Sequence, residues 1–205
     1  MLENVKIVSI IREVEVKNAL KIMEALSEEG ITYFEVSLSK VEMGLECIQA
    51  AQEYFVGTDV KVGAGTVSKK TEVDKLKGWG TPYILTPGFD EELVEYALEK
   101  KMEVLPGVLT PSDVQKAANR GLKLLKLFPA DAFGRKYVKA LKGPFPDINY
   151  VAVGGVTSQN VAEFFENGYA GIAAGSNLVP KQASEKDIKT IRESARRYMA
   201  ACRAK

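Results

Sequence analysis

Hydrophobic residues along the chain follow two alternating patterns, short apolar runs and longer stretches in which they recur every third or fourth position. Short apolar runs are typical of buried strands, and the longer spacing is typical of amphipathic helices. The expected strands are residues 5–11, 31–38, 60–65, 83–86, 104–106, 122–128, 150–153 and 170–174. The expected helices are residues 16–26, 41–55, 69–78, 91–100, 111–120, 135–142, 158–166 and 184–201.

Strands that alternate with helices predict a parallel sheet. Eight such units follow one another without a linker or low-complexity segment. At about 25 residues each they suffice to close a lean (β/α)8 barrel, with no room for a lid domain. We therefore expect one α/β domain over residues 1–205, a TIM barrel, with an open doubly wound sheet as the alternative.

Lys126 lies within the sixth apolar run. Side chains alternate along a strand, so Lys126 shares the face of Leu122, Leu124 and Phe128, which we expect to point into the barrel. A buried ammonium is costly, and burial lowers the pKa of a lysine. A neutral amine in such a place attacks ketones to form an imine. The alternative is a structural ion pair with Glu35.

Glu35 alternates with Phe34 and Val36 in the second apolar run, so it also faces the barrel if the apolar face packs on helices. Burial raises the pKa of a carboxyl group, whereas a nearby ammonium lowers it. The chain contains no histidine, which makes Glu35 the best candidate for acid–base catalysis. Its alternative role is charge balance for Lys126.

Composition excludes several classes of function. Without histidine there is no Ser-His-Asp triad and no imidazole ligand, and Cys47 and Cys202 alone do not make a zinc site, so we expect no metal. The net charge of +1 argues against a nucleic-acid partner. There is no apolar run long enough for a membrane span and no signal-peptide pattern, so we expect a cytoplasmic protein.

Glycine turns follow the seventh and eighth expected strands, at Gly154-Gly155 and at Gly175-Ser176. Barrels often bind phosphate at this position through backbone N–H groups. These glycines are thus candidates for phosphate binding, or they only form tight turns. The earlier segment 63–66 lacks the third glycine of a dinucleotide fingerprint.

Arg12 ends the first expected strand and Thr66 follows the third. Together they are candidates to bind a substrate carboxylate, through a guanidinium fork and a hydroxyl group. Arg12 can instead be a solvated residue at a strand end. Pro87 and Phe128 are candidates for the walls of the substrate pocket, or they serve packing alone.

Seven segments in order resemble the KDPG/KHG aldolases, which cleave 2-keto-3-deoxy-6-phosphogluconate or 4-hydroxy-2-oxoglutarate to pyruvate and an aldehyde. The resembling segments are Phe-Glu-Val-Ser-Leu (34–38), Val-Gly-Ala-Gly-Thr-Val (62–67), Leu-Thr-Pro-Gly (85–88), Leu-Pro-Gly-Val (105–108), Leu-Lys-Leu-Phe-Pro-Ala (125–130), Lys-Gly-Pro-Phe-Pro (142–146) and Gly-Gly-Val (154–156). The resemblance implies a homotrimer of barrels that acts on a small 2-keto acid without a metal or organic cofactor. It implies Lys126 as the Schiff-base lysine, Glu35 as the proton carrier, Thr66 near the carboxylate, and Gly154, Gly155 and Ser176 near the phosphate.

Two departures from the family pattern affect substrate recognition. Many members have an arginine four residues after the glutamate, where this chain has Ser39, so Arg12 or, more weakly, Lys40 takes its place. Val153 stands where many members have threonine, which removes a hydroxyl group from the pocket. Two segments, 132–141 and 152–157, look more like the branch that acts on the carbon-4 epimer, the galactonate compound. The preferred epimer therefore stays open.

Two other classes of function remain as alternatives. A non-catalytic barrel that only binds a ligand would retain the core pattern and the glycine turns, but it would not need Lys126 or Glu35. Another phosphate-binding barrel, such as an isomerase, would not form an imine with its substrate.

Overall fold

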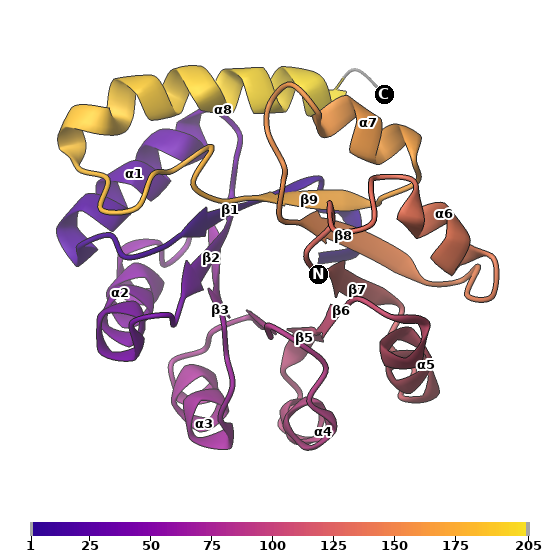
Figure 1. Ribbon diagram of the computed structural model, residues 1–205. Helices are drawn as coiled ribbons and strands as arrows, with labels where there is room; N and C mark the ends of the chain where they lie inside the picture. The colour runs from indigo at the N-terminus through magenta and orange to yellow at the C-terminus, as the bar shows by residue number, and fades with distance from the viewer. Residues whose placement is uncertain (1, 204–205) are drawn as a thin grey trace.

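The computed structural model, which describes residues 2–203, is a barrel of parallel strands surrounded by helices (Figure 1). All strand pairs are parallel, and the order around the sheet is β5-β4-β3-β2-β1-β9-β8-β7-β6. The strands are β1 (Ile7–Ile11), β2 (Tyr33–Ser37), β3 (Lys61–Gly65), β4 (Tyr83–Leu85), β5 (Glu103–Leu105), β6 (Gly107–Val108), β7 (Leu124–Leu127), β8 (Asn149–Val153) and β9 (Gly171–Ala174). The expected barrel is confirmed, and the open doubly wound sheet is not found.

The helices alternate with the strands as the hydrophobic spacing predicts. They are α1 (Val16–Glu28), α2 (Val41–Tyr54), α3 (Lys70–Gly78), α4 (Glu91–Glu99), α5 (Pro111–Asn119), α6 (Tyr137–Lys142), α7 (Val161–Glu166) and α8 (Ile188–Arg203), with short 3-10 helices η1 (Leu2–Asn4) and η2 (Glu185–Asp187). Thr110 caps α5 by accepting a hydrogen bond from the Asp113 backbone N–H. Within the described residues, no helix is long and apolar enough to cross a membrane.

The fifth expected strand, residues 104–106, corresponds to β5, which ends one residue earlier at Leu105, and a short strand that was not expected, β6, follows Pro106. Proline has no N–H to donate to a sheet, so a continuous strand is interrupted there. The Pro106 carbonyl still accepts a hydrogen bond of 3.0 Å from the Lys126 backbone N–H. Gly107 then pairs with Lys126 in the register of β6 and β7. The open seam of the barrel therefore lies between β5 and β6, next to the strand that carries the candidate lysine.

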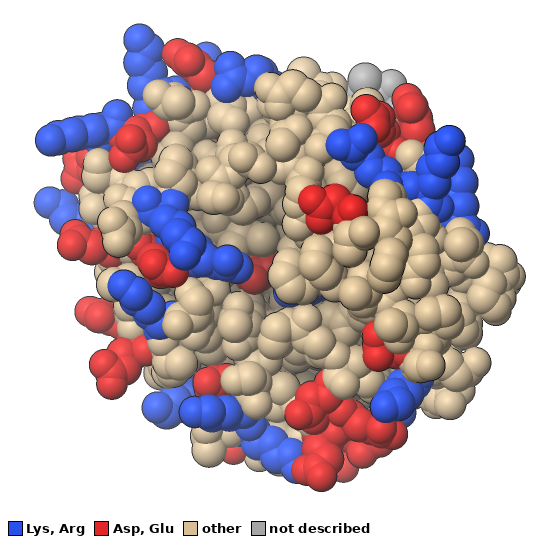
Figure 2. Space-filling view, viewed as in Figure 1, with Lys and Arg blue, Asp and Glu red and all other residues tan. Residues whose placement is uncertain are grey.

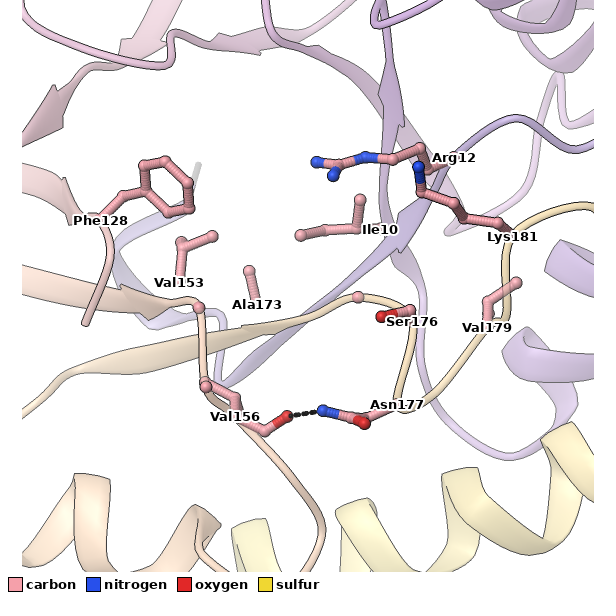
Figure 3. A pocket seen from close by; sticks show the side chains of 13 residues that line it. Ile10, Arg12, Phe128, Val153, Val156, Ala173, Ser176, Asn177, Val179 and Lys181 are labelled. Atoms are coloured by element: carbon pink, nitrogen blue, oxygen red, sulfur yellow. Dashed lines mark hydrogen bonds between the residues drawn. The ribbon is translucent and has the colours of Figure 1, made fainter. Parts of the chain in front are cut away.

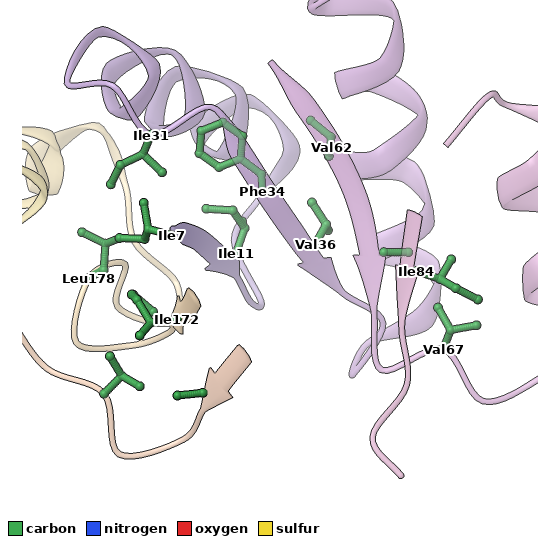
Figure 4. Close-up of a cluster of buried hydrophobic side chains, with 14 of the residues drawn as sticks. Ile7, Ile11, Ile31, Phe34, Val36, Val62, Val67, Ile84, Ile172 and Leu178 are labelled. Atoms are coloured by element: carbon green, nitrogen blue, oxygen red, sulfur yellow. The ribbon is translucent and has the colours of Figure 1, made fainter. Parts of the chain in front are cut away.

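The buried apolar side chains form two clusters, one outside the ring of strands and one inside it. The outer core lies between strands and helices, and Figure 4 shows Ile7, Ile11 and Phe34 among its residues. The alternate residues of β1, Val8 and Ile10, belong to a second cluster that contains no residue of the eight α-helices. The inner cluster comprises Leu2, Val8, Ile10, Tyr83, Leu85, Leu105, Leu124, Val151, Val153 and Ala173. Successive residues of a strand therefore point alternately to the outer core and to the barrel interior, as expected.

Gly63 on β3 makes room for the buried ring of Tyr83. A Cβ atom at Gly63 would lie 2.2 Å from this ring. The Tyr83 hydroxyl is itself fixed, because it donates a hydrogen bond of 2.7 Å to the Phe34 carbonyl. The absence of a side chain at Gly63 is therefore a packing requirement of the barrel interior.

We expect Gly63→Ala to destabilise the fold by roughly 1–3 kcal/mol, because the added methyl group overpacks the interior against Tyr83. Urea unfolding monitored by circular dichroism measures this change. The control is Gly78→Ala at the end of α3, where a Cβ meets nothing within 4 Å. We expect the control to be neutral or slightly stabilising, since alanine favours helix. Equal stability of the two variants would contradict the packing argument.

Candidate active site

Lys126 lies inside the barrel with only 5% of its surface exposed. Its Nζ donates a hydrogen bond of 3.1 Å to the Thr86 carbonyl at the end of β4. The same atom lies 4.9 Å from the centre of the Phe128 ring. Burial lowers the pKa of Lys126, the charge of Glu35 opposes this effect, and the charge of Arg12 adds to it. The site therefore shifts the amine toward its neutral, nucleophilic form relative to an exposed lysine.

Glu35 is also inside the barrel and is 1% exposed. Its carboxylate lies against Gly65, where a Cβ atom would stand 1.7 Å from Oε1. Its Oε2 is buried and has no hydrogen-bond partner within residues 2–203. Burial raises the pKa of Glu35, while Lys126 and Arg12 lower it to a smaller extent. These influences shift the carboxyl group toward its protonated form relative to an exposed glutamate, and one of its oxygens makes no hydrogen bond within the described residues.

A cavity of about 170 Å³ opens at the ends of β1, β8 and β9, and Figure 3 shows several of the side chains that line it. Lys126 and Glu35 are not among the lining residues. Seven of the candidate residues line it: Arg12, Phe128, Val153, Gly154, Gly155, Gly175 and Ser176. The Arg12 side chain extends into the space toward Phe128 (Figure 3). Phe128 connects the cavity to the buried amine, because its ring is also the one nearest Lys126 Nζ. The cavity thus combines an apolar wall with a guanidinium group and two glycine turns.

The two glycine turns are tied together by side chains. Gly154 and Gly155 have positive φ values of 98° and 68°, a conformation that favours glycine. Asn177 follows the second turn and donates a hydrogen bond of 3.0 Å to the Val156 carbonyl beside the first, as Figure 3 shows. Asn160 further holds the first turn through the Gly155 carbonyl, at 2.8 Å. The candidate anion site is therefore built before any ligand arrives.

Thr66 and Pro87 do not line this cavity. Thr66 directly follows β3 with a φ of 61°, which is uncommon for a β-branched residue. Its hydroxyl lies 3.1 Å from that of Ser37 on the neighbouring strand. Pro87 lies in a separate hollow with Thr86. The roles of Thr66 and Pro87 toward a substrate stay predictions.

The structure distinguishes the two candidates for carboxylate binding. Arg12 lines the cavity, and its charge reaches both Lys126 and Glu35. Lys40 lies instead in a small hollow between β2 and α2, close to Glu13. This placement favours Arg12.

Three residues near the site were not among the sequence-predicted candidates. Thr86 accepts from the lysine, and its hydroxyl also accepts from the Gly107 backbone N–H at 3.2 Å, but nothing in a strand-end threonine indicates this contact. Asn177 and Lys181 line the cavity from the loop after β9. The sequence signal for this loop was Gly175-Ser176, and the residues beyond it look like an ordinary polar loop.

The raised pKa of Glu35 predicts how stability depends on pH. The native carboxyl group keeps its proton to a higher pH than the unfolded chain, so stability from that proton is present below about pH 4.5 and is lost as pH rises through the native pKa. We expect Glu35→Gln to gain stability relative to wild type across this window, by about 1.4 kcal/mol per pKa unit of difference. Urea unfolding at several pH values measures this difference in the free energy of unfolding. The control is Glu53→Gln, at an exposed position of α2. A stability difference between Glu35→Gln and wild type that does not change with pH would contradict the assignment.

Comparison with known proteins agrees with this geometry. A family model for KDPG and KHG aldolase matches residues 1–194. The 2-dehydro-3-deoxy-6-phosphogalactonate aldolase of Escherichia coli is 36% identical over 173 residues, which cover 84% of this chain and 83% of that protein. The 2-dehydro-3-deoxy-phosphogluconate aldolase of Pseudomonas aeruginosa is 32% identical over 176 residues, covering 85% and 77%.

Two solved structures show the same similarity in three dimensions. A native KDPGal structure superposes with a TM-score of 0.86 at 32% identity, covering 97% of this chain and 94% of that chain. KDPG aldolase from Legionella pneumophila, solved with pyruvate captured as a covalent carbinolamine intermediate, gives a TM-score of 0.83 at 26% identity and covers 99% and 95%. The family match spans nearly the whole barrel that carries Lys126 and Glu35. The chain therefore belongs to the KDPG and KHG aldolase family.

Proposed function

We propose that this protein is a Schiff-base aldolase that reversibly cleaves 2-keto-3-deoxy-6-phosphogluconate to pyruvate and glyceraldehyde 3-phosphate. The observation that carries the proposal is the buried Lys126 amine, which has a lowered pKa, donates to the Thr86 carbonyl and lies 4.9 Å from the ring of Phe128, a residue that lines the cavity. 4-Hydroxy-2-oxoglutarate, which yields pyruvate and glyoxylate, is a further substrate of the same chemistry.

Lys126 supplies the nucleophile. One of its N–H bonds points to the Thr86 carbonyl, which leaves the nitrogen lone pair of the neutral amine free to attack. Attack on carbon 2 of the 2-keto acid gives a carbinolamine, and loss of water gives an iminium ion. The iminium withdraws electrons from the bond between carbons 3 and 4.

Glu35 moves the protons in this scheme. As a carboxylate it accepts the proton of the carbon-4 hydroxyl group, directly or through water, while the bond between carbons 3 and 4 breaks. The aldehyde leaves, and the remaining enamine takes a proton back at carbon 3 before hydrolysis releases pyruvate. The free Oε2 and the raised pKa suit a group that alternates between both protonation states.

The two ends of the substrate are bound by separate groups. Arg12 binds the carboxylate, with Thr66 placed beyond the cavity lining as a second candidate contact. Gly154, Gly155, Gly175 and Ser176 bind the phosphate. Fixing both ends places the bond to be cleaved near Lys126 and Glu35, which lowers the entropic part of the barrier.

The proposal extends to the oligomeric state and the cellular location of the protein. We infer a homotrimer, as the family resemblance implies, and mass measurement under native conditions tests it. We infer a cytoplasmic location, which agrees with two buried cysteines that form no disulfide within the described chain.

We expect borohydride, added with pyruvate, to leave one three-carbon adduct per chain at Lys126, because reduction traps the imine. Peptide mass spectrometry locates the adduct, and coupled lactate dehydrogenase measures pyruvate release. Lys126→Ala should form no adduct and lose activity by more than about 1,000-fold. The control is Lys123→Ala, which replaces an exposed lysine just before β7 and should retain both adduct formation and activity. Full retro-aldol activity in Lys126→Ala would refute the proposal.

The carbon-4 epimer, the galactonate compound, is a second candidate substrate, because it yields the same two products. Val153 favours it, since this apolar residue lines the cavity and offers no hydroxyl group to the gluconate epimer. The 36% identical relative in Escherichia coli bears the name of that activity.

We expect Val153→Thr, which adds a hydroxyl group with little change in shape, to shift the preference toward the gluconate epimer by roughly 10-fold, the effect of one added hydrogen bond. The measurement is kcat/KM for both epimers, determined with wild type and variant. An unchanged ratio, or a shift toward the galactonate epimer, would count against a role for Val153 in selecting the substrate.

A further inference from the structure

Two cations line the cavity, and the scheme above uses only one of them. Within the part of the chain that the structure describes, the basic residues of the lining are Arg12 and Lys181. Arg12 comes from the end of β1, and Lys181 comes from the loop between β9 and η2. In Figure 3 the Arg12 guanidinium reaches across toward Phe128, while the Lys181 amine stays at the side from which both residues enter. The two charges are therefore presented at different places in one cavity.

The backbone holds Lys181 at this position. The Lys181 amine forms an ion pair of 2.9 Å with Glu13, and the backbone N–H of the next residue, Gln182, donates to the Glu13 carbonyl at 3.1 Å. Glu13 and Gln182 have φ values of 55° and 58°, a region that residues other than glycine seldom occupy. Such conformations persist where surrounding contacts fix them, and they concentrate at ligand-binding sites. The two loops are thus joined where Lys181 enters the cavity.

The charges of the proposed substrate favour a second cation. Its carboxylate is bonded to the carbon that Lys126 attacks, so the group that binds it must be close to Lys126. Arg12 meets this condition, because its charge acts on both Lys126 and Glu35. The phosphate at the other end carries a charge of about −1.5 to −2, so a cation beside it strengthens its binding through charge-assisted hydrogen bonds. Lys181 is the remaining cation of the lining, in the same loop as Ser176.

We propose that Lys181 binds the phosphate group of the substrate together with Ser176 and the glycine turns, while Arg12 binds the carboxylate. This inference rests on the proposed function, because it assigns one end of the proposed substrate. A lysine amine has three N–H donors, so Lys181 can keep its bond to Glu13 while it donates to phosphate. The Lys181 side chain is 54% exposed, so an entering phosphate does not have to displace it from the protein interior.

The test compares 2-keto-3-deoxy-6-phosphogluconate with the same sugar acid lacking the phosphate. We expect Lys181→Met to lower kcat/KM for the phosphorylated compound by about 10- to 100-fold, the range for a lost hydrogen bond to a charged group. We expect a change of less than about 2-fold for the unphosphorylated compound, because its carboxylate contacts remain. Inorganic phosphate should also inhibit wild type competitively and inhibit Lys181→Met more weakly.

Two further variants separate phosphate binding from a purely structural ion pair. If Lys181 only secured the loop through Glu13, then Glu13→Gln would reproduce the loss seen in Lys181→Met. If Lys181 binds phosphate, Glu13→Gln retains the preference for the phosphorylated compound, since the cation is still present and a competing anion is gone. Lys189→Met, an exposed lysine of α8 outside the cavity lining, is the control for a lost positive charge.

The outcomes distinguish this inference from the proposed function. Wild type that releases no pyruvate from either compound would overturn the proposed function. Wild type that is active, with Lys181→Met equally impaired on both compounds or on neither, would overturn only the role of Lys181. Equal losses in Glu13→Gln and Lys181→Met would likewise assign Lys181 to the loop alone.

Discussion

The burial of the Lys126 amine is the constraint on which the rest of the site depends. An amine in the apolar interior is costly as an ammonium ion, so the fold must either pair it or let it lose its proton. Here it receives one carbonyl, from Thr86, and the face of one aromatic ring. The backbone of the same residue holds the nearly closed barrel together, because its N–H donates to the Pro106 carbonyl. The backbone that carries the Lys126 amine is therefore fixed where the barrel closes.

A second constraint is space. A carboxylate and a tyrosine ring must enter the barrel interior from neighbouring strands, and β3 accommodates both by having no side chain where they lie. A Cβ atom at Gly65 would overlap Glu35, and one at Gly63 would overlap Tyr83. The segment that partly resembles a nucleotide-binding fingerprint therefore has a different physical purpose, which is to leave room for the side chains of Glu35 and Tyr83. Burial at such close quarters also gives Glu35 its raised pKa.

Much of this arrangement could be predicted from the sequence, because it follows from local rules. Alternation along the strands assigned Glu35 to the barrel interior, and it did the same for Lys126. The absence of histidine then left Glu35 as the best candidate for proton transfer. The short strand β6 after Pro106 was not predicted, because two residues are too few to give a strand pattern and proline usually ends a strand. Contacts that depend on how loops meet could not be predicted: nothing local brings the Thr86 carbonyl to the lysine or joins the loops at Glu13 and Gln182.

The net charge of the chain shows the same limit of prediction from sequence, because it does not say where in the fold the charges meet. A total of +1 argues against a long polyanionic partner, which needs a wide basic surface. A small anion instead responds to charges within about one Debye length, roughly 8 Å under physiological conditions. Figure 2 shows acidic and basic side chains mixed over this face, with basic groups reaching toward the central hollow. Arg12 and Lys40 lie close enough to Glu13 to lower its pKa, as does the directly paired Lys181, so three cations surround one anion there. Because a cleft with low-dielectric walls concentrates the field of such a group, a nearly neutral protein can still attract a small, highly charged substrate to one opening.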